Sequence, residues 1–266
     1  MSMILLVVFG VGLAAGFVDA IAGGGGLIML PGLLFSGLPV GSAIATNKLC
    51  GTFGALTSSL KFAQSKQVDW QACIAMGIPA IIGAYLGSRS IDKLPSTWAE
   101  PLVIVLIVLI TLFVVLKPEF GITPTPTRPT ENSEALLPNS SKPLSRGRLL
   151  SGIAAGSVIG FHDGFFGPGT GIFLVFSLLS LWSLDFLRGT GTTKVINLMT
   201  NVTALIIFAA AGNIDYSKGL WGALGVGIGS LLGATFATRK GAKMIKPIFI
   251  VVTIALVSKL AIDYVR

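Results

Sequence analysis

Apolar segments alternate with short polar turns along the chain, apart from one long polar stretch at residues 118–148. Five apolar segments lie on each side of it, at about residues 3–22, 27–37, 40–61, 70–88 and 98–116 and at about 149–166, 171–182, 188–211, 217–237 and 247–264. A helix of about 20 apolar residues spans a hydrocarbon core, where backbone groups must be satisfied within the segment. The pattern therefore predicts an all-α polytopic membrane protein.

The two sides resemble each other in an ordered series of short matches. GFVD at 16–19 matches GFHD at 160–163, which is 144 residues further on, and TNK at 46–48 matches TTK at 192–194, 146 residues further on. Such a series indicates an internal duplication. We therefore predict a first transmembrane repeat at residues 1–117, a Pro/Thr/Ser-rich cytoplasmic linker at 118–148 and a second transmembrane repeat at 149–266.

An odd number of segments in each repeat predicts that the second repeat is inverted in the membrane. The loop charges agree with this. The loop after the third segment is basic in the first repeat and uncharged in the second, whereas the loop after the fourth is the more basic one in the second repeat. Because basic loops favour the cytoplasm, we expect both chain ends outside and the linker inside.

The second segment of each repeat is short, broken or half-length, and follows a glycine-rich break, AGGGG at 22–26 or FGPGTG at 166–171. A helix of about 11 residues reaches only half-way through a hydrocarbon core. The chain then either completes the crossing or turns back. Two helix N-termini near the midplane would form an anion site, since each exposes N–H groups and partial positive charge. Tight packing through small residues is the alternative. The candidate positions are Gly24, Gly25, Gly26, Gly169 and Thr170.

The composition excludes most other classes of protein. Of the 266 residues, 53% are apolar and 11% are charged, against about 25% charged in soluble domains. The net charge of +8 is better explained by basic cytoplasmic loops than by nucleic acid binding. We expect a multi-pass protein of the cell inner membrane, in contact with the lipid bilayer and not with nucleic acid, and leave a homodimer open.

Two lysines lie inside apolar segments at equivalent places, Lys48 and Lys194. A charged lysine at mid-bilayer costs about 2.5–3.5 kcal/mol, and intramembrane ionisable residues are candidates for function. We expect the two lysines to face an anion, with its oxygens oriented by Asn47, Thr193 and Asn197. A structural ion pair with Asp163 or Asp19, or snorkelling to the interface, is the alternative.

Asp19 and Asp163 precede the two breaks by four residues, and His162 is the only histidine in the chain. The aspartates could bind a coupling proton or sodium ion. We prefer a structural role, in which they accept hydrogen bonds from freed N–H groups or neutralise the lysines. A proton relay through His162 is a further alternative. The chain has no phosphate-binding loop and no hydrolase or metalloprotease motif, so we expect no enzyme activity, cofactor or metal site.

Three stretches that contain these residues resemble signature sequences of the TauE/SafE sulfite exporter family: GFVDAIAGGGGLIMLPGLL, SAIATNKL and GFHDGFFGPGTG. The similarity covers both repeats and is closest to the YfcA-like members, described as probable membrane transporters. It implies a bacterial inner-membrane protein of many spans. It also implies a substrate such as sulfite, sulfoacetate or a related sulfur-containing anion, which suits paired lysines and helix ends.

Together these features predict a secondary transporter, working as an exporter, for a small sulfur-containing anion. The anion would bind near the midplane and be carried by alternating access as the repeats rock against each other. A passive anion channel on the same fold is one alternative. A non-transporting membrane scaffold or assembly factor is another.

Overall fold

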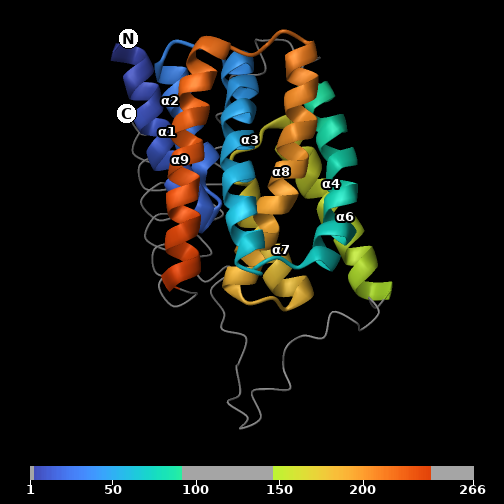
Figure 1. Cartoon of the computed structure of the whole chain (residues 1–266). Helices are drawn as coiled ribbons and strands as arrows, with labels where there is room; N and C mark the ends of the chain where they lie inside the picture. Colours follow the sequence, from blue (N-terminus) through green and yellow to red (C-terminus); the bar gives the residue numbers. More distant parts are fainter. Residues whose placement is uncertain (1–2, 92–145, 241–266) are drawn as a thin grey trace, which may run out of the picture.

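The computed structural model describes residues 3–91 and 146–240, and every regular element in these two ranges is a helix (Figure 1). The first range holds α1 (Met3–Ala22), α2 (Gly25–Phe35), α3 (Val40–Gln64) and α4 (Trp70–Ile91), and the second holds α6 (Arg146–Phe165), α7 (Thr170–Trp182), α8 (Phe186–Ala210) and α9 (Tyr216–Lys240). The predicted all-α class is confirmed. The predicted segments 98–116 and 247–264 lie outside the described residues, as does the linker up to residue 145.

Local sequence signals explain where the helices end. Asp185 caps the start of α8, because its carboxylate accepts hydrogen bonds from the N–H groups of Leu187 and Arg188 at 2.9 and 3.0 Å. Pro39 stands immediately before α3, where its missing N–H costs nothing. Helix α6 begins at Arg146, so residues 146–148 belong to this helix and not to the predicted linker.

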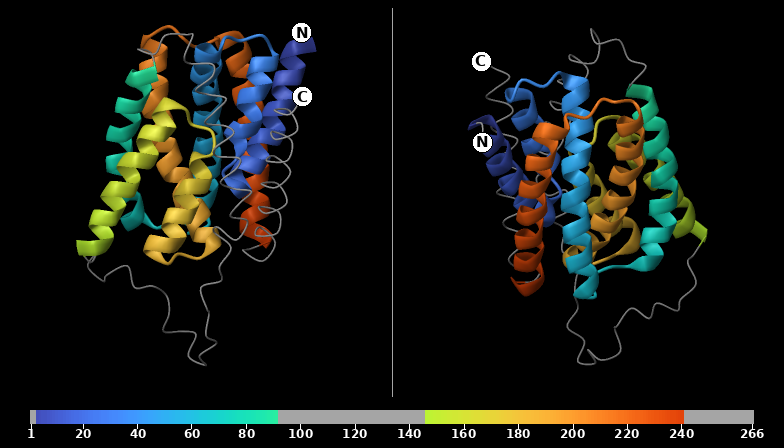
Figure 2. Two further views of the ribbon diagram at one scale, coloured as in Figure 1. Left: turned by 180° about the vertical axis from the view of Figure 1, so that it is seen from behind. Right: turned by 45° about the horizontal axis from the view of Figure 1, so that its top comes forward.

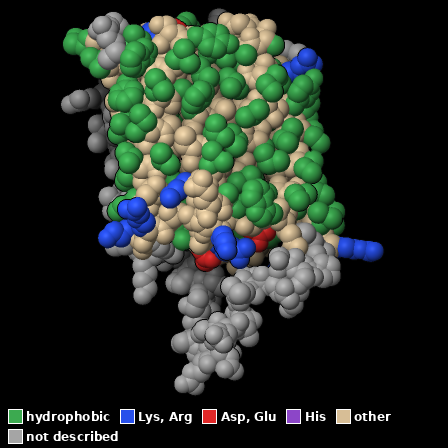
Figure 3. Space-filling view, in the orientation of Figure 1, with side chains coloured by type: hydrophobic (Ala, Val, Ile, Leu, Met, Phe, Trp, Pro, Cys, Tyr) green, Lys and Arg blue, Asp and Glu red, His purple; other side chains and the backbone are tan. Residues whose placement is uncertain are grey.

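Four of the described helices are long and apolar enough to cross a membrane, namely α1, α4, α8 and α9. Exposed apolar side chains recur every four residues on α4, at Trp70, Ile74, Ile78, Ile82 and Leu86, and on α9, at Tyr216, Leu220, Leu224, Ile228 and Leu232. Hydrophobic side chains cover most of one face of the molecule, and most Lys and Arg side chains on it gather toward one end (Figure 3). An apolar exterior of this kind is expected of a protein surrounded by lipid.

Corresponding helices of the two ranges run in opposite directions. Helix α3 descends in the view of Figure 1 and α8 ascends beside it, while α4 ascends and α9 descends. The other views keep this arrangement (Figure 2). The contacts correspond as well, because α1 packs on α9 as α6 packs on α4, and α1 packs on α2 as α6 packs on α7.

The helices group into two bundles that exchange one helix each. We call α1, α2, α3 and α9 the first bundle, and α6, α7, α8 and α4 the second bundle. The N–H of Asp215 donates to Thr46 Oγ1 at 3.0 Å and fixes the start of α9 on α3. The N–H of Asp69 donates to Thr192 Oγ1 at 2.9 Å and fixes the start of α4 on α8. Between the bundles, the main packing among the described helices is α3 against α8.

Small residues let the exchanged helices approach closely. Gly156, Gly160 and Gly164 of α6 lie directly against the backbone of Met76, Ala80 and Ala84 of α4. On the other side, Gly225, Gly229 and Gly233 of α9 lie against the backbone of Phe9, Leu13 and Phe17 of α1. Membrane helices associate through such small-residue faces, because van der Waals packing replaces the hydrophobic effect there.

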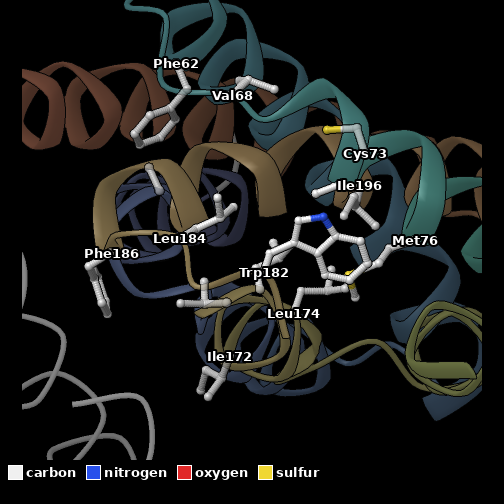
Figure 4. Close-up of a cluster of buried hydrophobic side chains, with 14 of the residues drawn as sticks. Phe62, Val68, Cys73, Met76, Ile172, Leu174, Trp182, Leu184, Phe186 and Ile196 are labelled. Atoms are coloured by element: carbon white, nitrogen blue, oxygen red, sulfur yellow. The ribbon is translucent and has the colours of Figure 1, made fainter. Parts of the chain in front are cut away.

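A buried apolar cluster lies mainly in the second bundle and extends to α1, α2, α3 and α9. Trp182 of α7 lies beside Met76 of α4, Ile196 of α8 and Leu174 of α7 (Figure 4). This packing holds α7 in place, and the start of α7 carries part of the site described next.

Candidate functional site

The two glycine-rich breaks meet in the middle of the molecule. The break between α1 and α2 places Gly23, with φ +72°, against Gly171 in the first turn of α7. A Cβ atom added to Gly171 would lie 2.5 Å from the carbonyl oxygen of Gly23. Because the two backbones touch, neither position has room for a side chain. The start of α2, in the first bundle, therefore lies next to the start of α7, in the second bundle.

Each buried lysine pairs with an aspartate of the other repeat. Lys48 Nζ of α3 lies 2.9 Å from Asp163 Oδ1 of α6, and Lys194 Nζ of α8 lies 2.8 Å from Asp19 Oδ2 of α1. Both lysines are almost completely buried, with exposed fractions of 1% and 0%. These are the ion pairs that the sequence left open as an alternative to free cationic groups. Both pairs also join the two bundles.

The two aspartates differ in their remaining contacts. Asp19 uses both oxygens, because Oδ1 also accepts the N–H of Gly25 in the first turn of α2, at 3.1 Å. Asp163 has only the Lys48 contact, and its second oxygen, Oδ2, is buried with no hydrogen-bond partner among the described residues. The first aspartate thus caps a broken helix, and the second keeps one unsatisfied carboxylate oxygen.

A cavity of about 50 Å³ lies between the breaks and the two central helices. It is lined by Ala15, Asp19, Gly23, Gly25, Gly26, Met29, Asn47, Lys48, Cys50, Gly51, Ala55, Asp163, Gly167, Gly169, Thr170, Gly171, Asn197, Asn201 and Val226. A single water needs roughly 10–15 Å³ of such space, so the cavity holds a few waters or one compact ion. Its lining combines charged, amide and hydroxyl groups, as in a site for a small polar solute.

The structure brings nine of the candidate residues to this cavity: Asp19, Gly25, Gly26, Asn47, Lys48, Asp163, Gly169, Thr170 and Asn197. Four candidates lie outside its lining: Lys194, Thr193, Gly24 and His162. Lys194 reaches the cavity only through Asp19, and the ring nitrogen Nδ1 of His162 lies 3.2 Å from the hydroxyl of Thr170. Gly24 is the residue just before α2, and Thr193 is fully buried.

Several lining residues were not among the candidates. Asn201 Nδ2 donates to the carbonyl oxygen of Asn197 at 2.8 Å, and a Cβ on Gly51 would meet Asn201 Oδ1 at 3.1 Å. Gly167, with φ +94°, leaves space for Lys48, since a Cβ there would lie 2.8 Å from Nζ. The signal for Asn201 is its place one turn beyond Asn197 on α8, whereas the place of Gly167 depends on packing between distant segments.

Comparison with known proteins agrees with this architecture. The model of the family described as Sulfite exporter TauE/SafE matches residues 8–260, which is most of the chain. The chain belongs to the TauE/SafE family. It is 33% identical over 249 residues to "Probable membrane transporter protein ORF9" of Sinorhizobium sp, covering 94% of this chain and 89% of the relative.

Two further relatives of the TauE/SafE protein carry similar names. It is 30% identical over 260 residues to a "Probable membrane transporter protein" of Haemophilus influenzae, covering 98% of this chain and 95% of the relative. It is 29% identical over 264 residues to "Probable membrane transporter protein YfcA" of Escherichia coli strain K12, covering 98% of this chain and 91% of the relative. No solved structure matches the chain. The protein is thus a multi-pass membrane transporter of this family.

Proposed function

We propose that the protein is a secondary transporter that exports a small sulfur-containing anion, such as sulfite or an organosulfonate, across the cell inner membrane. One observation carries this proposal. A buried polar cavity that includes the Lys48 ammonium lies where two broken helices begin. Helix N-termini, an ammonium and amide groups together favour an anion.

The anion binds in the cavity through groups from both bundles. Lys48 has three N–H donors and spends one on Asp163, so two remain for substrate oxygens. The side chains of Asn47 and Asn197 orient those oxygens. The first turns of α2 and α7 supply those backbone N–H groups that are not already bonded to Asp19, Gly24, Gly167 or Gly169. Lys194 acts through Asp19, which it holds against the start of α2.

The size of the cavity favours compact substrates. About 50 Å³ of space suits a small oxyanion better than a long organic chain. The substrate class suggested by the family description fits this limit.

Alternating access arises from rocking of the two bundles about the contact between α3 and α8. The moving bodies are therefore the bundles and not the two sequence repeats, because α4 moves with the second bundle and α9 with the first. Support comes from the opposite directions of corresponding helices, an arrangement found in transporters built from inverted repeats (Figure 1).

Flux into proteoliposomes tests the proposal, with sulfite, sulfate, thiosulfate, taurine and sulfoacetate as a panel. We expect saturable flux of one anion and a loss of at least about tenfold in Lys48→Met, equivalent to the removal of one charge-assisted contact. Lys61→Met is the matched control, because Lys61 lies in the last turn of the same helix and outside the cavity.

Equal flux in wild type and Lys48→Met would contradict the proposed site. Large currents that do not saturate would indicate a channel. Folded protein that moves none of the anions and purifies with a partner protein would indicate a scaffold.

A further inference from the structure

The carboxylate of Asp163 is the one charged group of the cavity with an oxygen left unsatisfied. The Asp163 side chain is 3% exposed, Oδ1 contacts Lys48 Nζ, and Oδ2 has no hydrogen-bond partner among the described residues. Asp19, its counterpart, has both oxygens engaged. A buried polar atom without a partner is costly, and such atoms in folded proteins call for an explanation.

We infer that Asp163 Oδ2 is a proton-binding site that couples proton movement to anion movement, an inference that rests on the proposed transport function. When Oδ2 takes up a proton, the carboxylate becomes a neutral acid and gains a donor that it lacks as an anion. Lys48 keeps its own proton and its positive charge. Asp19 stays ionised beside Lys194 and continues to cap α2.

The charge balance shows why a proton helps an anion to bind. Lys48 and Asp163 together carry no net charge while the carboxylate is ionised, and an incoming anion competes with that carboxylate for the ammonium. After protonation the pair carries one positive charge, which a monovalent anion returns to zero. By linkage, the anion strengthens proton binding as much as the proton strengthens anion binding. One proton therefore travels in the same direction as each anion, so export requires an outward anion gradient larger than the opposing pH gradient.

A proton fits this oxygen better than a metal cation does. The Lys48 ammonium already occupies the other oxygen of the same carboxylate, so a sodium ion at Oδ2 would meet a positive charge close by. Within residues 3–91 and 146–240, no group of three or more His, Cys, Asp or Glu side chains is placed to hold a metal ion.

Most charged groups on the helices that neighbour Asp163 are already paired. Helix α3 offers Lys48 and the buried Cys50, whose thiol donates to the carbonyl oxygen of Gly219 at 3.6 Å. Helix α8 offers Lys194, which is bound to Asp19, and Arg188, which is bound to Asp69. Helix α4 carries the buried Cys73 and the exposed Tyr85 and Arg89, and the guanidinium of Arg89 lies over the Tyr85 ring at 5.0 Å. On α6 itself, His162 has Nδ1 beside Thr170 and Nε2 without a partner among the described residues. Helix α7 contributes no charged side chain.

Infrared difference spectroscopy of the purified full chain in lipid nanodiscs tests this assignment without any substrate. As the pH is lowered, we expect a carboxylic acid C=O band to grow in the wild type. The band should be lost in Asp163→Asn and kept in Asp69→Asn, which changes a partly exposed aspartate outside the cavity lining. A band that persists in Asp163→Asn, or none in the wild type, would overturn the inference.

A second variant covers the case in which Asp163→Asn does not fold. In Lys48→Met the buried carboxylate has no counter-charge, so its acid band should be present at higher pH than in the wild type. A pH-dependent band of unchanged midpoint in Lys48→Met would also overturn the inference.

Coupling is then measured in proteoliposomes as the pH dependence of flux of the anion that the panel shows to be transported, compared between wild type and Asp163→Asn so that titration of the anion itself cancels. Flux should rise by up to about tenfold for each unit by which pH falls, the limit for one coupled proton. That dependence should vanish in Asp163→Asn. Sodium-dependent flux, or pH-dependent flux retained in Asp163→Asn, would refute the coupling. Absence of flux for every anion of the panel refutes the proposed function, while the infrared result still decides whether Asp163 binds the proton.

Discussion

Lys194 is completely buried, and its ammonium lies against one carboxylate oxygen of Asp19. A buried ion pair contributes little net stability, because the cost of desolvating both groups offsets their attraction. Removing one partner is different, since it leaves a charge with neither water nor counter-charge. The pair therefore makes the protein depend on both residues, whichever of them touches the substrate.

Asp19→Asn is expected to destabilise the protein by about 3–5 kcal/mol, because it leaves the Lys194 ammonium unpaired. The double variant Asp19→Asn/Lys194→Met should recover most of that loss. Thermal unfolding of the purified protein measures both. Asp69→Asn is the matched control, since the 3.4 Å pair of Asp69 with Arg188 is partly exposed and should be worth less than about 1 kcal/mol. Strictly additive single and double variants would contradict a direct interaction between Asp19 and Lys194.

The polar residues were visible in the sequence, but their pairing was not. Two lysines and two aspartates within apolar segments signal buried charge whatever the fold. Which aspartate meets which lysine depends on helix packing across 115 residues for Lys48 and 175 residues for Lys194. The unequal surroundings of Asp19 and Asp163 could not be predicted either, because the two residues occupy equivalent places in similar motifs.

At the scale of the elements, the two breaks form a single structure. Each break ends one helix and starts another, and the two meet at the contact of Gly23 with Gly171. The starts of α2 and α7 are therefore positioned by each other, and the cavity between them depends on that contact. A change in one break is transmitted to the other bundle.

Gly171→Ala is expected to destabilise the protein by about 1–3 kcal/mol and to weaken anion binding, because its Cβ would press on the backbone of Gly23. Gly41→Ala is the control, since a Cβ at Gly41 in the first turn of α3 meets nothing within 4 Å. That change should be neutral or stabilise by up to about 1 kcal/mol. Unfolding temperature and anion binding report the two effects, and a Gly171→Ala protein as stable as the control would exclude a tight contact.

The helix boundaries were largely predictable, because apolar runs end at Gly, Pro and polar residues. The predicted segment 3–22 coincides with α1, and the short segments correspond to α2 and α7. The bundle to which each helix belongs was harder to predict from the sequence. Helices α4 and α9 show ordinary apolar faces, and their exchange follows from glycine contacts with α6 and α1 that no local pattern encodes.

At the scale of the whole molecule, the two ends differ in charge. Lys61 and Lys66 lie at the end of α3, while the turn before α9, residues 211–215, has no basic residue. Figure 1 places the end of α3 and the start of α9 at opposite ends of the molecule. The positive-inside rule then assigns the end of α3 to the cytoplasm.

Cysteine labelling in intact cells tests this orientation. In a background without Cys50 and Cys73, Ser217→Cys at the start of α9 should react with a membrane-impermeant maleimide. Gln64→Cys at the end of α3 should react only after the cells are permeabilised. Both side chains are exposed, so access decides the result. Labelling of both variants from outside would contradict the orientation, and the reverse pattern would invert it.

The exchange of α4 and α9 between the bundles has an evolutionary consequence. A shorter ancestor with one repeat would have had its fourth helix directed away from its own bundle, with the glycine face of the first helix left uncovered. Two such chains, inserted in opposite directions, would cover each other's exposed faces and place each lysine beside the aspartate of the other chain. Fusion of the two genes would then have made the partnership permanent. Duplication of the gene would have left the two copies free to diverge, so that one aspartate kept both oxygens engaged and the other did not.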